Sequence, residues 1–153
     1  MTAGYLYATR PELPPPPEAP YPSQVTDVTY LAPEHPATES AAFRFAVLVT
    51  VRSGPEVTVA DIGQPYPGLS LITNPRTPFP TTTGMPRKIT ITFTAADCGK
   101  VPRNAGLPFL DVTLRNTRAI EEHSFILGER YAQDLSDALR AACGNQSATS
   151  PNH

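Results

Sequence analysis

The stretch Lys88-Ile89-Thr90-Ile91-Thr92-Phe93-Thr94-Ala95 decides the fold class of this chain. Its apolar side chains, Ile89, Ile91 and Phe93, alternate with threonines, so that one face of an extended strand is apolar and the other polar. This period of two is typical of a strand that covers a core on one side and contacts water on the other. We therefore expect residues 88–95 to form a half-buried strand of an antiparallel sheet.

Further segments show the same alternation. The odd-numbered positions from Phe43 to Val51 are all apolar, and Leu110, Val112 and Leu114 alternate with polar residues. Weaker strand candidates are residues 25–31, 56–62, 69–73 and 120–127. Gly, Pro and Asn separate these segments, and residues 74–86, with four prolines, predict a crossing loop or an irregular edge. Short strands at this spacing are typical of an antiparallel β-sandwich.

A helix is expected over residues 129–143. Gly128 breaks the preceding strand, and apolar residues then recur at helical spacing. The stripe consists of Tyr131, Leu135, Ala138, Leu139 and Ala142. Gly144 is well placed to end the helix, and the stripe needs the sheet as its partner. The chain is thus predicted to be mainly β, with one C-terminal α-helix packed on the sandwich.

Proline divides the chain of 153 residues into segments. Nineteen residues are proline, against a usual share of about 5%, and seven of them lie between positions 11 and 22. Such a run favours an extended polyproline II conformation, although a disordered N-terminus is an equal alternative. The expected segments are an N-terminal stub at 1–10, a proline-rich stalk at 11–23, the domain at 24–144 and a disordered tail at 145–153.

Residues 3–9, Ala-Gly-Tyr-Leu-Tyr-Ala-Thr, are small, apolar and aromatic. Tyrosines at the end of an apolar stretch are typical of a membrane interface. The stub is therefore interpreted either as the outer end of a transmembrane helix that this chain lacks or as an ordinary frayed terminus. No apolar run in the chain approaches the roughly 18 residues that cross a bilayer.

Composition excludes several classes of protein. Only 17% of residues are charged and 40% are hydrophobic, which fits neither a disordered charged tail nor a coiled coil. The net charge is −2, whereas a nucleic-acid-binding domain is usually basic. We therefore expect no nucleic acid among the partners.

Cys98 and Cys143 are the two cysteines, 45 positions apart. Without a CxxC motif or a nearby histidine they do not indicate a metal site. We expect a structural disulfide, because each cysteine lies at the end of a regular element beside a glycine. Two buried free thiols, or one catalytic thiol, are the alternatives. A disulfide across this loop would stabilise the fold by about 4 kcal/mol in the chain-entropy model and would imply an oxidising compartment.

Catalytic patterns are nearly absent from the sequence. The histidines are His35, His123 and His153, and adjacent strand residues such as His123 and Ser124 point to opposite faces, so their adjacency does not indicate a triad. The pair Glu121 and Glu122 is interpreted as a solvated edge. We expect no catalytic residues, no cofactor and no metal; the alternative is a small secreted hydrolase or thiol enzyme using His123.

Basic residues are concentrated in one part of the sequence, where they give a local charge of +5 between positions 76 and 118. This candidate patch consists of Arg76, Arg87, Lys88, Lys100, Arg103, Arg115 and Arg118. Clustered basic groups attract anionic polymers or lipid headgroups. The other interpretation is compensation by carboxylates within the domain.

The order of the segments carries a resemblance: a small apolar stub, a proline run, the stretch YPSQVTDVTYL, a sandwich, then DC and LPFLDVTLRNTRAIEEHSFILGERYAQDLSDALRAAC. It resembles uncharacterised membrane-anchored or secreted proteins of high-GC Gram-positive bacteria, of the Tat-pathway signal domain type. The resemblance implies an N-terminal membrane anchor, an outward-facing immunoglobulin-like domain and a Cys98–Cys143 bridge. It supplies no catalytic residues, and this chain lacks the spanning helix that it implies.

Together these observations predict a non-enzymatic extracytoplasmic domain, membrane-anchored or secreted, with an interaction or structural role at the cell surface. The expected partners are the membrane, through the anchor, and a cell-surface protein or anionic polymer bound by loops at 64–68 and 74–87. A cytoplasmic partner protein with reduced thiols is a further alternative.

The anchor hypothesis makes a prediction about the gene. An apolar segment of about 20 residues is expected in frame just upstream of Ala3, because the stub would then be its outer end. Sequencing the upstream genomic frame tests this prediction. A stop codon immediately before Met1 would count against the stalk.

Overall fold

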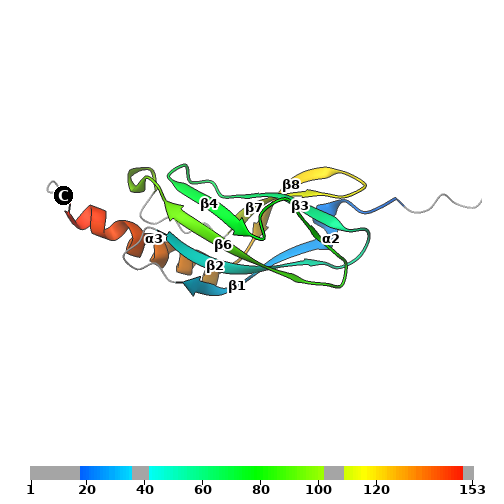
Figure 1. The fold of residues 1–153 in the computed structure, drawn as a ribbon, viewed down its shortest axis with the longest axis horizontal. Coiled ribbons are helices and arrows are strands. Elements are labelled where there is room, and N and C mark those ends of the chain that lie inside the picture. The colour runs from blue at the N-terminus through cyan, green and yellow to red at the C-terminus, as the bar shows by residue number, and fades with distance from the viewer. Residues whose placement is uncertain (1–17, 36–41, 102–108, 150–153) are drawn as a thin grey trace, which may run out of the picture.

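Two antiparallel sheets pack face to face in the computed structural model, which describes residues 18–35, 42–101 and 109–149 (Figure 1). One sheet has the order β1 (Thr26–His35), β2 (Ala42–Val51), β6 (Arg87–Ala95), β4 (Leu69–Asn74). The other has the order β5 (Phe79–Thr81), β3 (Val57–Gly63), β7 (Phe109–Arg115), β8 (Ile120–Ile126). The predicted antiparallel β-sandwich is confirmed, and the proline-rich stretch at 74–86 contributes the short edge strand β5.

The strand order can be compared with that of immunoglobulin domains. Constant-type domains pair strands A, B, E and D in one sheet and C, F and G in the other. When the strands are matched in chain order, β1, β2, β6 and β4 correspond to A, B, E and D. Strands β3, β7 and β8 then correspond to C, F and G. β5 is an additional strand beside β3. The disulfide that joins strands B and F in antibody domains has no counterpart here, because the cysteines lie outside the strands.

The inner face of β6 lies at the centre of the core. Ile89, Ile91 and Phe93 are each 0% exposed, while Thr90 and Thr92 on the other face are partly accessible. β6 pairs with β2 on one side and β4 on the other. The strand alternation in the sequence therefore identified the middle of this sheet.

Helix α3 (Glu129–Thr149) covers the aromatic end of the core. Its apolar stripe is buried except for the partly buried Ala142, and the ring of Tyr131 meets those of Tyr30 and Phe45 edge-on at 5.3 and 5.8 Å. The predicted packing of the helix on the sheet is confirmed. Its predicted end was wrong, because the helix passes through Gly144 and the first residues of the expected tail. One glycine costs a helix only about 1 kcal/mol relative to alanine, which is too little to end it.

The domain also begins earlier than predicted. Residues 18–23 of the expected stalk belong to the folded part, where Pro22 is buried and starts the short helix α2 (Pro22–Val25). Proline suits the first turn of a helix because its φ angle is preset and its missing N–H is not needed there. Residues 1–17, which include the stub, and residues 150–153 lie outside the described residues.

The hydroxyl of Tyr131 generates a prediction about stability. The side chain is 0% exposed, burial raises its pKa, and its oxygen has no hydrogen-bond partner among the described residues. We expect Tyr131→Phe to raise the free energy of unfolding by about 1 kcal/mol, since it removes a buried unpaired group. Tyr131→Ala should lower it by about 3–5 kcal/mol, because it leaves a cavity.

Urea unfolding followed by circular dichroism measures both changes. A Phe variant that is less stable than the wild type by more than about 1 kcal/mol would contradict the assignment of an unpaired hydroxyl.

Candidate functional site

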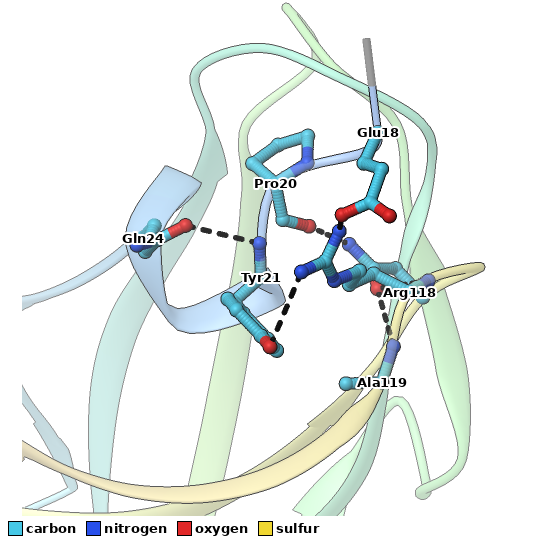
Figure 2. Close-up of polar contacts among 7 residues, drawn as sticks. Glu18, Pro20, Tyr21, Gln24, Arg118 and Ala119 are labelled. Carbon is cyan, nitrogen blue, oxygen red and sulfur yellow. Dashed lines mark hydrogen bonds and ion pairs between the residues drawn. The ribbon is translucent and has the colours of Figure 1, made fainter. Parts of the chain in front are cut away.

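The turn between β7 and β8 holds the N-terminal segment through a group of residues that we call the N-terminal clamp: Glu18, Pro20, Tyr21, Asn116 and Arg118. The Arg118 guanidinium forms an ion pair with Glu18, and it lies over the ring of Tyr21 at 4.5 Å from the centroid (Figure 2). Its Nη2 donates to the Tyr21 hydroxyl at 3.3 Å. One side chain on the turn thus holds two points of the incoming segment.

Asn116 shapes the same turn. Its Oδ1 accepts from the backbone N–H groups of Arg118 at 2.8 Å and Ala119 at 3.1 Å, as asparagine often does in turns. Its Nδ2 donates to the carbonyl of Pro20 at 2.8 Å. The amide group that builds the turn therefore also binds the main chain of the proline-rich segment.

The clamp was not found from the sequence. Asn116 beside Arg118 indicates a turn between two strands, but its partners at Pro20 and Tyr21 are almost a hundred positions away. No local pattern reports a contact over that separation.

The predicted basic residues are distributed over the molecule and several have carboxylate partners. Lys88 Nζ lies 3.2 Å from Glu34 Oε2, and Lys100 Nζ lies 3.9 Å from Asp97 Oδ2. Arg118 belongs to the clamp. Carboxylates within the domain therefore neutralise part of the positive charge of the candidate patch. This agrees with the interpretation of the pattern as internal compensation.

The other basic residues of the candidate patch lie on further elements of the fold. Arg87 lies over the ring of Phe79 at 5.2 Å and donates to the carbonyl of Pro80. Arg76 and Arg115 are exposed on different segments, and Arg103 lies outside the described residues. Lys100 follows one end of β6, whereas Arg118 lies at the opposite end of the sandwich beside the start of β1.

The end of the sandwich opposite the clamp is closed by a disulfide bond between Cys98 and Cys143. Cys98 begins the short 3₁₀ helix η1 (Cys98–Lys100) directly after β6, and Cys143 lies on α3. The bond attaches the helix to the central strand of the sheet. With both sulfurs bonded, neither cysteine is available as a catalytic thiol or a metal ligand.

A polar contact attaches the same helix to β1. The hydroxyl of Tyr30 donates to Asp134 Oδ2 at 2.7 Å, and the guanidinium of Arg130 lies over the Tyr30 ring at 5.0 Å. Burial and the hydrogen bond to Asp134 raise the pKa of Tyr30 far above its ordinary value. Tyr30 thus remains a neutral donor throughout the physiological pH range.

The loop at 64–68 lies beside η1 at this end and is held by Gln64. Its Nε2 donates to the carbonyls of Tyr66 at 3.1 Å and Leu69 at 2.5 Å, and its Oε1 accepts from the N–H of Tyr66 at 2.6 Å. Gly68 allows a close approach to η1, since a Cβ there would lie 2.2 Å from the carbonyl oxygen of Asp97. The loop is therefore fixed against the disulfide-bonded end.

His123 and Ser124 do not come together into a nucleophilic pair. The exposed His123 ring packs edge-on against Phe125, with centroids 4.7 Å apart. Ser124 lies on the other face of β8, where its hydroxyl donates to Asp111 Oδ1 at 2.5 Å. The expectation that adjacency does not make a triad here agrees with this geometry.

Over residues 18–35, 42–101 and 109–149, no three His, Cys, Asp or Glu residues are grouped so that they could bind an ion. His153 and the side chain of His35 lie outside the described part of the chain. In that same part, no helix is both long and apolar enough to cross a membrane.

Comparison with known proteins assigns no family to this chain, since no family model and no curated protein matches it. The resemblance given by the order of the segments therefore stays a prediction.

The clamp predicts the effect of removing Arg118. We expect Arg118→Ala to speed amide hydrogen exchange in residues 18–25 by about three- to tenfold, because a cation–π contact and a surface ion pair are each worth up to about 1 kcal/mol. Glu18 is 76% exposed, which keeps its share small.

Hydrogen-exchange mass spectrometry makes this measurement. Arg115→Ala is the matched control, since Arg115 is an exposed arginine of the same hairpin that makes no clamp contact. Equal exchange in the two variants would show that Arg118 does not hold the segment.

Proposed function

We propose that this chain is a non-enzymatic, immunoglobulin-like extracytoplasmic domain of a membrane-anchored or secreted protein, with an interaction or structural role at the cell surface. The N-terminal segment connects the domain to its anchor, and the opposite end presents helix α3 and the loop at 64–68 to a partner.

The Cys98–Cys143 bond carries this proposal. It closes a loop of 45 positions, for which the chain-entropy model gives about 4 kcal/mol, a large part of the net stability of a small domain. Disulfides of this kind persist in oxidising compartments and are rare in the cytosol. A domain that depends on such a bond belongs outside the cytoplasm.

The arrangement of the two ends supports the anchored form. Glu18 and Pro20 are held at the clamp, at one end of the long axis, and α3 with the disulfide lies at the other (Figure 1). An anchor that precedes the proline-rich segment would therefore leave the α3 end farthest from the membrane.

The loop at 64–68 is the part of that end best suited to binding. It is held in one conformation by Gln64 and lies against η1 beside the disulfide. Loops positioned by a rigid scaffold commonly carry recognition, and a preorganised loop loses little conformational entropy when it binds. We assign this loop as the first surface to test for a protein or anionic-polymer partner.

The proposal predicts the redox state of the cysteines in the natural host. Protein isolated without reductant, denatured and treated with an alkylating reagent should carry no alkyl groups by mass spectrometry, because both sulfurs are bonded. A reduced sample is the control and should carry two groups. Two groups in the unreduced sample would favour the cytoplasmic alternative and overturn the proposal.

The same proposal predicts that His123 is not a catalytic residue. Any hydrolase activity found in a broad substrate screen should be unchanged in His123→Ala. Loss of such an activity in this variant would instead support the enzyme alternative.

A further inference from the structure

Strand β8 is an edge of its sheet that no proline and no bulge interrupts. The other edge strands are interrupted: β1 contains Pro33 and two register shifts, β5 contains Pro80, and β4 ends directly before Pro75. β8, with the sequence Ile-Glu-Glu-His-Ser-Phe-Ile, contains no proline, lysine or bulge. Proteins commonly use these devices, and charged side chains, to block edges; of these β8 has only the charges of Glu121 and Glu122.

The outer side of β8 exposes two large apolar side chains. Ile120 is 67% exposed and Ile126 is 70% exposed, and between them on the same face lie Glu122 and Ser124. On the other face Phe125 is buried, and Glu121 accepts a hydrogen bond from the backbone of Ser23. The two ends of this edge strand thus each expose one isoleucine.

The two exposed isoleucines are placed symmetrically about His123. Ile120 and Ile126 are each three positions from it, so that two copies of β8 running antiparallel about this residue would place each Ile120 opposite the Ile126 of the other copy. We propose that a second copy of this chain pairs with β8 in this way, about a two-fold axis at His123. Symmetric interfaces of this isologous kind are the commonest in homodimers.

The main-chain hydrogen-bonding groups of β8 are directed as this register requires. The N–H of Asn116 donates to the carbonyl of Ala119 across the turn, and bonded and non-bonded pairs then alternate along the hairpin. Because Asn116 and Ala119 form a bonded pair, every second residue of β8 after Ala119 directs its N–H and C=O toward β7. The residues between them direct these groups away from the sheet; they are Ile120, Glu122, Ser124 and Ile126. In the proposed register these residues are opposite one another, and His123 is opposite its own copy at a non-bonded position.

The side chains give one favourable and one unfavourable pair. Each Ile120 is covered by Ile126 of the second copy, and cross-strand apolar pairs contribute about 0.2–1 kcal/mol each. The two Glu122 side chains are diagonal neighbours, within about 7–8 Å, and repel one another. The symmetry favours a second copy over an unrelated strand, because a foreign strand would have to supply both apolar contacts.

Sedimentation velocity on the purified domain tests the proposal. The wild type should reach a mass of about 33 kDa, twice the 16.5 kDa of one chain, as its concentration rises. Ile120→Lys should weaken the dimer at least tenfold, since it places a charge on the edge, and Glu122→Gln should strengthen it. This measurement needs no membrane and is therefore independent of the proposed anchoring.

Ile72→Lys is the matched control, because Ile72 is 59% exposed on β4, the edge strand of the other sheet. It should leave the dimer unchanged. A wild type that stays monomeric up to millimolar concentration would overturn the proposal, as would a dimer that Ile72→Lys disrupts and Ile120→Lys does not.

His123→Cys tests the register itself. Residues at a non-bonded position have Cα atoms about 4.5 Å apart, within the range of a disulfide, so mild oxidation should join two chains of this variant. Ile72→Cys should not form such dimers. A dimer in solution without this cross-link would place the interface elsewhere and overturn the assignment to β8.

Discussion

Burial of the inner face of β6 is the constraint on which the remaining structure depends. This strand pairs with β2 and β4, and its Ile89, Ile91 and Phe93 side chains are excluded from water. Each such side chain contributes about 1.5–3 kcal/mol when it is fully buried. The second sheet and helix α3 both pack against this surface. Cys98 follows the end of β6 by three positions, so the same strand also places the covalent link.

The two ends of the sandwich are built by different physical means. At the clamp, one arginine and one asparagine hold the N-terminal segment through an ion pair and a part-buried hydrogen bond, which are individually weak. At the other end a disulfide, a buried tyrosine and a helix are combined. Local opening is therefore expected first at the clamp, whereas the α3 end retains its geometry. That difference agrees with a flexible attachment at one end and a preorganised surface at the other.

The accuracy of sequence reasoning varied with the range of the interaction concerned. β2, β6, β7 and the start of α3 were predicted well, because the alternation of apolar residues reports directly on burial. The end of α3 and the beginning of the domain were misplaced, since Gly144 and the prolines before Val25 act only weakly on a helix or segment that tertiary contacts hold. The candidate basic patch stays a prediction, although part of its charge is compensated by Glu34, Asp97 and Glu18.

By itself, the sequence determined the fold class, the position of the main strands and the apolar stripe of the helix, because these follow from periodicity within one segment. Only the tertiary structure decided which strands lie at the edges and that Arg118 holds Tyr21, and it confirmed the predicted bond between Cys98 and Cys143 over its alternatives. These contacts join positions from 45 to almost a hundred residues apart. Their pairing depends on how the two sheets are stacked, and no local pattern of side chains encodes that arrangement.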